Sequence, residues 1–166
     1  MKISKKIIKN LKMGGVNFYL SVPCKLLANM IKILEKDKSV YYSSVPREEE
    51  GIGICAGANL GNKLPCIMMQ NTGIGNSINA IVSLSQLYNL PVILLISYRG
   101  TVGETVGAQS STANITEDFL HTLRVPFLKC SSEKDLDGII KLAKHSKVTE
   151  SPVAILCDFE LMSNDK

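Results

Sequence analysis

Residues 66–79 read CIMMQNTGIGNSIN, and the order of these side chains decides the fold class. The run opens with apolar residues over a length typical of a buried β-strand. A polar turn that contains glycine follows, and an apolar pattern with helical spacing begins near Ser77. A strand, a turn and a helix in this order form the repeating unit of α/β proteins.

The same unit recurs along the chain on both sides of this stretch. Strands are predicted at residues 18–22, 40–43, 66–69, 92–96, 126–128 and 153–157, and helices at residues 25–36, 47–60, 77–88, 116–123 and 134–145. This alternation predicts a doubly wound α/β fold, in which a mainly parallel six-stranded sheet has helices on both faces. We expect one such domain over residues 13–166, and within it residues 99–114 are predicted to form a long functional or mobile loop.

The first 12 residues differ from the rest of the chain in charge. They hold five lysines and no acid, which accounts for the formal net charge of +4, because only 14 basic residues then remain against 15 acidic ones. Their isoleucines and leucine recur at helical spacing, so we predict a lysine-rich amphipathic helix over residues 1–12 whose lysines face water. A nucleic-acid-binding surface is the less favoured interpretation.

The composition also excludes several classes of protein. Apolar runs such as residues 91–96 are far shorter than the roughly 20 residues that a membrane-spanning helix needs, and the N-terminal segment lacks the apolar core of a secretory signal. The five cysteines stand singly, without the paired spacing of a zinc site, which fits reduced thiols. His121 and His145 form no known motif with a nucleophile. We therefore expect a cytoplasmic protein that supplies no metal site of its own.

Chemistry is expected in the segments that follow the strands, because ligands of open parallel sheets bind beyond the carboxyl ends of the strands. After the second strand, Pro46 marks the start of a helix whose first turn carries Glu48, Glu49 and Glu50. Acidic first turns are common, so a structural role is favoured for these glutamates taken alone. The same helix holds three glycines, each costing about 0.5–1 kcal/mol relative to alanine. A second chain or a ligand packed against its bare backbone would compensate.

Two further segments lie at the same predicted edge. The turn at residues 70–76 offers free backbone amides at a helix start, but it lacks the third glycine of a dinucleotide fingerprint and the lysine of a phosphate loop. A plain tight turn and a ligand site are equally well supported there. Arg99 follows the fourth strand, where its guanidinium could hold a carboxylate or sulfonate by two hydrogen bonds or lie on the surface as an ordinary arginine.

Taken in order, these segments resemble the pyrimidine-binding domain of thiamine-diphosphate-dependent 2-oxoacid decarboxylases. The family places a glutamate nine residues before a glycine in a helix of small residues, and Glu48 stands nine residues before Gly57. Glu49 and Glu50 are the alternates if this register is wrong by one or two. Three stretches are similar to the subgroup that decarboxylates sulfopyruvate or phosphonopyruvate: MQNTGIGNS at residues 69–77, VP at residues 22–23 and YRG at residues 98–100.

The resemblance implies thiamine diphosphate as the cofactor and a role for each matching residue. Glu48 would bind the pyrimidine ring and activate the cofactor, which makes it the implied catalytic residue. Further cofactor contacts are implied for Thr72, Gly73, Ile74 and Asn76, and substrate contacts for Gln70, Asn71, Arg99 and Gln109.

One departure from the family pattern concerns the diphosphate. The chain has no counterpart of the Gly-Asp-Gly to Asn motif by which such enzymes hold Mg2+ and the diphosphate. The resemblance therefore implies a partner, a beta subunit that carries this half, and a hetero-oligomer that acts on a small anionic 2-oxoacid. Such a split is similar to the enzyme of coenzyme M biosynthesis, which favours sulfopyruvate over phosphonopyruvate as the substrate.

A second departure concerns the proton donor. Cys24 stands where relatives often have an acid after Val-Pro, and no histidine precedes Gln109 in its loop. Proton transfer to the product is therefore expected to depend on the partner chain. Two alternatives stay open: another 2-oxoacid on the same machinery, and a non-catalytic α/β module that binds nucleotides.

Overall fold

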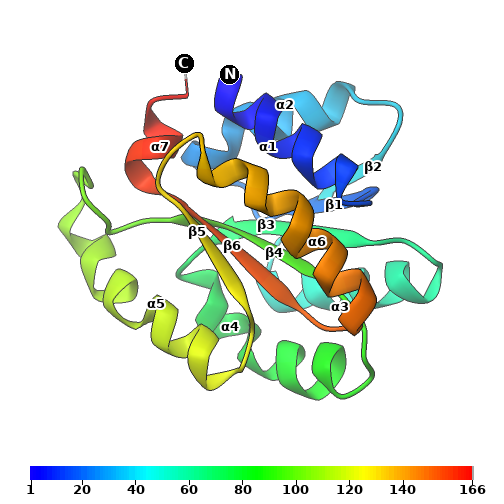
Figure 1. The fold of residues 1–166 in the computed structure, drawn as a ribbon. Helices are drawn as coiled ribbons and strands as arrows, with labels where there is room; N and C mark the ends of the chain where they lie inside the picture. Colours follow the sequence, from blue (N-terminus) through cyan, green and yellow to red (C-terminus); the bar gives the residue numbers. More distant parts are fainter. Residues whose placement is uncertain (166) are drawn as a thin grey trace.

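A computed structural model describes residues 1–165, and a single parallel sheet lies at the centre of the molecule (Figure 1). Its six strands pair in the order β2-β1-β3-β4-β6-β5, and every pairing is parallel. The strands are β1 (Phe18–Ser21), β2 (Tyr41–Ser44), β3 (Pro65–Gln70), β4 (Ile93–Tyr98), β5 (Phe127–Cys130) and β6 (Val153–Asp158). The predicted six-stranded parallel sheet is therefore confirmed.

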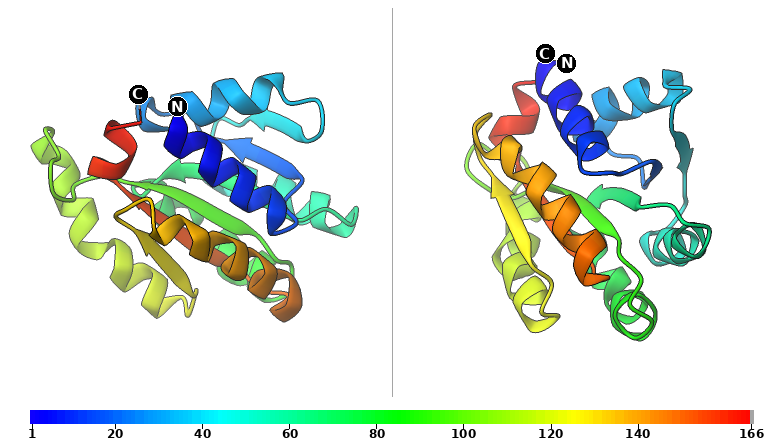
Figure 2. Two further views of the ribbon diagram at one scale, coloured as in Figure 1. Left: turned by 45° about the horizontal axis from the view of Figure 1, so that its top comes forward. Right: turned by 45° about the vertical axis from the view of Figure 1, so that its right-hand side comes forward.

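Helices cover both faces of the sheet, as Figure 2 shows from two sides. One face carries α1 (Lys2–Met13), α2 (Ala28–Lys36) and α6 (Gly138–Thr149), and the other carries α3 (Glu48–Leu60), α4 (Gly73–Ala80) and α5 (Ser110–Thr122). The side chains of each strand alternate between two hydrophobic cores, as the pleat of a strand requires. In β3 and β4 all side chains except that of Gln70 are buried, which is typical of strands covered on both faces.

The predicted loop at residues 99–114 is wrong over its second half. A short 3-10 turn, η3 (Gly107–Gln109), leads directly into α5, so the irregular stretch covers only residues 99–106. Serine and threonine residues favour a loop in this stretch, but in the structure their hydroxyls form hydrogen bonds inside the helix. Thr116 Oγ1, for example, donates to the Thr112 carbonyl at 2.6 Å. Ala113, Thr116 and Leu120 form the buried stripe that holds this helix on the sheet.

The predicted helix at residues 77–88 begins earlier, at Gly73, and changes type along its length. After α4 the chain continues as η2 (Ile81–Gln86), a stretch of π-helix, in which Ile81 and Ser85 are the buried residues. Because a π-turn shifts the register of side chains, this change re-aims the exposed face of the helix.

The N-terminal helix packs against α6 and α2 and contributes Ile7, Ile8 and Leu11 to one of the two cores. Three of its lysines pair with acids of neighbouring elements: Lys2 with Glu133, Lys6 with Asp137 and Lys12 with Asp37. The hydrogen bond from Lys12 lowers the pKa of Asp37 to about 2. These lysines thus fasten the helix to the domain as well as facing water.

The carboxylate of Asp165 caps the first turn of α1, which brings the two ends of the chain together (Figure 1). It accepts the backbone N–H of Ile3 at 2.8 Å and of Ser4 at 3.1 Å, and it lies 2.9 Å from the Met1 ammonium. Burial raises the pKa of Asp165, but the hydrogen bonds from Ser4 and the amino terminus outweigh burial, so the net pKa is lowered. A carboxylate at a helix N-terminus is stabilised by the helix dipole.

Replacing Asp165 by asparagine is therefore expected to lower the free energy of unfolding by about 1–2 kcal/mol at neutral pH, the usual scale for losing a charged N-cap. A carboxyl group with a lowered folded pKa stabilises the fold above its unfolded pKa, and that stability disappears as the pH falls through the folded pKa. The difference between wild type and variant should accordingly shrink below about pH 4. Urea unfolding across pH 3–7 measures it. Glu160→Gln on α7 (Phe159–Ser163), an exposed site, is the control.

Candidate functional site at the carboxyl edge of the sheet

The candidate site lies where the strands end, because the sheet order brings four chain segments to one edge. β3 lies between β1 and β4, so the turns after these three strands are neighbours, and α3 starts beside them after β2. β2 lies on one side of β1 and β3 lies on the other, so the direction in which strands are added reverses at β1. Such a switch point is where open α/β sheets bind ligands.

Glu48, the first residue of α3, packs directly against the turn after β3. A Cβ atom on Gly73 would lie only 2.5 Å from both Cγ and Oε1 of Glu48, so the glutamate side chain covers a place that only glycine leaves open. Asn76, one turn further along α4, donates its amide to Glu48 Oε2 at 3.3 Å. The side chain is half-buried. The structure thus brings together three residues for which the sequence predicts cofactor contacts.

The two alternate glutamates make other contacts. Glu49 forms an ion pair with Arg47 at 2.7 Å, and its other oxygen, Oε2, is buried without a hydrogen-bond partner among residues 1–165. Glu50 is exposed. Glu48 is therefore the first-turn glutamate that meets the β3 turn, and its catalytic role stays a prediction.

The remaining predicted cofactor contacts differ in how they face the edge. Thr72 is exposed, and its hydroxyl lies 3.5 Å from Gln70 Oε1, at the end of β3. Ile74 is fully buried in the core beneath α4. Any contact that Ile74 makes with a ligand at this edge must therefore come from its backbone.

Asn71 lies behind the edge and joins the ends of two strands to a helix. Its side-chain oxygen accepts the Arg99 N–H at 3.1 Å, while its amide donates to the Arg99 carbonyl at 3.1 Å and to Thr116 Oγ1 at 3.2 Å. The residue is only 2% exposed. Its amide thus holds the start of the 99–106 loop. The predicted contact with substrate would require these hydrogen bonds to break and the side chain to become exposed.

Arg99 is held by an acid that the sequence analysis does not single out. Its Nε and Nη2 donate to the two oxygens of Glu104 at 2.6 and 2.8 Å, and both side chains are largely buried, with 12% and 5% exposed. The pair lowers the pKa of Glu104 to about 2 and raises that of Arg99. Glu104 also accepts the backbone N–H groups of Gly100, Thr105 and Val106. The 99–106 loop is therefore wrapped around one buried carboxylate.

Gln109 is brought to the same loop through Gly100. A Cβ on Gly100, whose φ is +81°, would lie 2.3 Å from the Gln109 carbonyl oxygen, so this close approach requires glycine. The side-chain oxygen of Gln109 is buried and has no hydrogen-bond partner within the described residues. An acceptor left in this state is suited to a donor group supplied by a ligand or a second chain.

Two residues of this edge, Lys25 and Phe159, are not among the predicted site residues, and Cys24 is predicted only to stand where relatives often have an acid. Cys24 approaches Ser97 with Sγ and Oγ 3.4 Å apart, so the turn after β1 crosses over the end of β3 to reach β4. Phe159, the first residue of α7, lies with its ring centroid 5.3 Å from the Arg99 guanidinium carbon. Lys25 follows Cys24 on the same turn. The spacing of Arg99 and Glu104, five residues apart, is a local sequence signal for their ion pair. No sequence signal indicates that the turn after β1 crosses the end of β3.

The outer surface of α3 and α4, which begins beside Glu48, is bare. Cβ atoms added to Gly53, Gly57 or Gly75 would meet no atom within 4 Å. Ile54 and Leu60 are 46% and 78% exposed on the same helix α3. We call this the α3–α4 surface. It is the exposed glycine helix for which the sequence predicts a second chain or a ligand.

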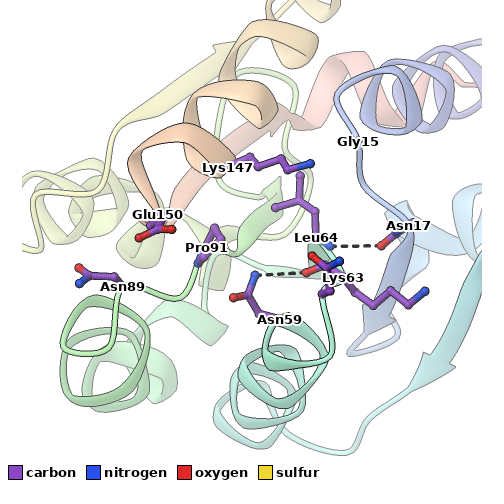
Figure 3. A pocket seen from close by; sticks show the side chains of 10 residues that line it. Gly15, Asn17, Asn59, Lys63, Leu64, Asn89, Pro91, Lys147 and Glu150 are labelled. Carbon is purple, nitrogen blue, oxygen red and sulfur yellow. Dashed lines mark hydrogen bonds between the residues drawn. The ribbon is translucent and has the colours of Figure 1, made fainter.

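A hollow of about 210 Å³ at the opposite edge of the sheet has a structural explanation (Figure 3). It lies at the amino ends of the strands, where Asn17 accepts the N–H of Leu64 at 3.2 Å and Asn59 donates to the Lys63 carbonyl at 3.2 Å. These bonds fix the turns that enter the strands. The hollow is at the end of the sheet that ligands of this fold class do not use.

Residues 1–165 hold neither a candidate metal centre nor a candidate membrane-spanning helix. In this range no group of three or more His, Cys, Asp or Glu side chains could hold a metal ion. Nor does the described part of the chain contain a helix of the length and apolar character needed to cross a membrane.

The chain is similar over its full length to two curated proteins. It is 39% identical to the sulfopyruvate decarboxylase subunit alpha of Methanococcus maripaludis, with 100% of both chains covered. It is 41% identical to the protein of the same name from Methanocaldococcus jannaschii over 95% of this chain and 94% of that one. A phosphonopyruvate decarboxylase of Streptomyces viridochromogenes is 36% identical over 54% of this chain and 23% of its own length. No protein-family model matches the chain.

Solved structures show the same fold at low sequence identity. A benzoylformate decarboxylase from Polynucleobacter necessarius matches with a TM-score of 0.75 and 14% identity, over 96% of this chain and 30% of that chain. A 2-oxoglutarate:ferredoxin oxidoreductase from Magnetococcus marinus matches with a TM-score of 0.75 and 15% identity, over 96% of this chain and 29% of that chain. In both proteins the matched fold is one part of a longer chain.

Proposed function

The chain belongs to the family of sulfopyruvate decarboxylase alpha subunits, and on that premise we propose that it is one chain of a two-chain carboxy-lyase that converts sulfopyruvate to sulfoacetaldehyde and carbon dioxide. The observation that carries this proposal is the identity of 39–41% over nearly the whole length of relatives that bear that name. A name that specifies a subunit also implies a second chain. Coenzyme M biosynthesis is the pathway that the sequence resemblance implies.

Phosphonopyruvate is the less favoured substrate. The phosphonopyruvate decarboxylase match covers only 54% of this chain, whereas the sulfopyruvate decarboxylase matches cover 95–100%. The assay that decides between them gives the assembled two-chain enzyme each 2-oxoacid in turn. A higher kcat/KM for phosphonopyruvate than for sulfopyruvate would overturn the substrate assignment while leaving the reaction type intact.

Thiamine diphosphate is the proposed cofactor, and the carboxyl edge fits its pyrimidine half. Glu48 presents a half-buried carboxyl group that, among residues 1–165, accepts one side-chain amide at 3.3 Å, so it retains capacity to share a proton with a ring nitrogen. Because residue 73 is glycine, no side chain occupies the space beside that carboxyl group. When bound, thiamine diphosphate supplies the carbon nucleophile and the electron sink for decarboxylation.

In this proposal the chain's own residues would position the cofactor and the substrate and would share a proton with the pyrimidine ring. The Glu48 carboxyl holds the pyrimidine nitrogen and shares its proton, and Asn76 orients that carboxyl through Oε2. The Asn71 amide fixes the backbone of Arg99, and Glu104 fixes its guanidinium. A site closed by a second chain would exclude water from these groups.

The proposed partner is a beta subunit that holds the diphosphate and Mg2+, and the α3–α4 surface is where we place it. Helix α3 carries Glu48 at its first turn and the bare glycines 53 and 57 further along. A chain that docks on this helix is therefore brought directly beside the catalytic carboxyl. Close packing on exposed glycine backbone also offsets the intrinsic cost of those glycines in a helix.

Gly73→Ala is expected to lower kcat of the assembled enzyme at least about tenfold, because displacing one catalytic group typically costs that much. The added methyl would overlap Glu48 at 2.5 Å, and the glutamate side chain must rotate away from the turn. The free energy of unfolding of the isolated chain should fall by roughly 1–2 kcal/mol, since a side chain rather than backbone gives way.

Gly75→Ala is the matched control for the fold, since a Cβ at position 75 on the same helix meets nothing within 4 Å. Melting of the isolated chains separates the two effects. If Gly73→Ala keeps full turnover, the contact between Glu48 and Gly73 does not position the catalytic group.

A further inference from the structure

We propose that Lys25, together with Arg99, forms a subsite for the terminal acidic group of the substrate. The proposal rests on the proposed function, because it assigns the part of the site that separates a 2-oxoacid with a second anionic group from one without. The sequence resemblance assigns no role to Lys25.

Lys25 and Arg99 line one cavity of about 490 Å³ at the carboxyl edge. The other walls come from the 99–106 loop and from α7, through Thr105, Val106 and Phe159. Figure 1 shows α7 beside the start of α2 at this edge, and α7 contacts η1 (Lys25–Leu27), the 3-10 turn that leads into α2. The cavity thus combines Lys25, the ion-paired Arg99 and the carboxylate of Asp165 with hydroxyl groups and apolar walls, a lining of the mixed kind that binds small polar ligands.

The topology places this cavity at the same edge of the sheet as Glu48. Lys25 follows β1 and Arg99 follows β4, and the strand between them is β3, whose turn packs on Glu48. The 3.4 Å approach of Cys24 to Ser97 shows that the turn before Lys25 reaches across the end of β3. A substrate held at this cavity therefore lies at the same edge as the residues that hold the cofactor.

The charges around the cavity leave Lys25 as its source of positive charge. Arg99 is neutralised by Glu104, and the carboxylate of Asp165, which also lines the cavity, is taken up by the first turn of α1 and the Met1 ammonium. Within residues 1–165 no hydrogen bond or ion pair occupies the Lys25 ammonium. Lys25 supplies the charge and the guanidinium of Arg99 supplies directed N–H groups, the combination that sulfonate or phosphonate oxygens require.

The test compares two substrates in the assembled two-chain enzyme. Lys25→Met is expected to lower kcat/KM for sulfopyruvate roughly 10- to 100-fold, the scale of one hydrogen bond to a charged group. For pyruvate, which lacks the terminal acid, the loss should be at least about tenfold smaller. Lys25→Arg should restore most of the preference for sulfopyruvate. Lys9→Met, at an exposed lysine of α1, is the matched control.

A binding measurement without turnover tests the subsite independently of the proposed reaction. Titration calorimetry of the assembled enzyme with sulfoacetate should show binding that Lys25→Met weakens about tenfold or more and Lys9→Met does not. Equal losses for both oxoacids, or sulfoacetate binding that is insensitive to Lys25, would overturn the subsite. A wild-type pair that binds sulfoacetate through Lys25 yet releases no carbon dioxide from sulfopyruvate would instead overturn the proposed function.

Discussion

Replacing Glu48 by glutamine in the assembled enzyme should lower kcat roughly 100-fold or more, the usual scale for removing acid–base assistance. Glutamine keeps the size and shape of the side chain, so the packing on Gly73 and the hydrogen bond from Asn76 can persist. It cannot share a proton with a ring nitrogen as a carboxyl group does. Steady-state kinetics at saturating cofactor measures the loss, with assembly of the two chains checked by gel filtration.

The neighbouring glutamates provide the comparison. Glu49→Gln and Glu50→Gln should lose much less, because Glu49 pairs with Arg47 and Glu50 is exposed. A large loss at one of them with near-normal turnover of Glu48→Gln would move the catalytic position along the helix and preserve the mechanism. Full turnover in all three variants would remove the cofactor assignment.

The isolated chain should show no decarboxylation of sulfopyruvate above the rate without protein, even with thiamine diphosphate and Mg2+ present. The chain lacks the sequence motif by which this enzyme class holds the diphosphate, and the proposed function therefore assigns that half of the active site to the partner. Mixing the purified beta subunit with this chain should restore turnover in proportion to complex formed. Turnover by the isolated chain would refute the split site.

The docking face can be tested in the same assay. Gly53→Phe on the α3–α4 surface should leave the isolated chain folded, since a Cβ there meets no atom within 4 Å, but should block assembly and with it turnover. Val148→Phe, at a residue 82% exposed on α6 and on the opposite face of the sheet, is the matched control. Normal assembly of Gly53→Phe would place the partner on another face.

The regular part of this fold could be predicted from the sequence because its signals are local. Apolar runs separated by helical patterns predict the six strands, and the observed strands differ from the predicted ones by three residues or fewer at each end. The start of α5 at Ser110 could not be predicted in the same way. Its serines and threonines favour loops in isolation, and they become helical because Ala113 and Thr116 are buried against the sheet.

The candidate site could be predicted only in part. The turn after β3 and the first turn of α3 could each be located from the sequence, because each follows a strand and ligands bind beyond the carboxyl ends of parallel strands. The occupation of the Asn71 amide depends on side-chain geometry that no spacing encodes. The neutralisation of Arg99 by Glu104 left a local signal in the spacing of the two residues, but the spacing alone does not show that the pair is buried. The same holds for Lys25, whose place in the site follows from a turn that crosses β3.

The cap that Asp165 places on α1 also has a consequence in time. During synthesis α1 is made long before its cap, because the carboxylate that satisfies its first turn lies about 160 residues later in the chain. Contacts of such sequence separation slow folding, because a long loop must close before they form. We therefore expect α1 and α7 to dock last, after the sheet, so that the cavity lined by α7 is completed in the final step of folding.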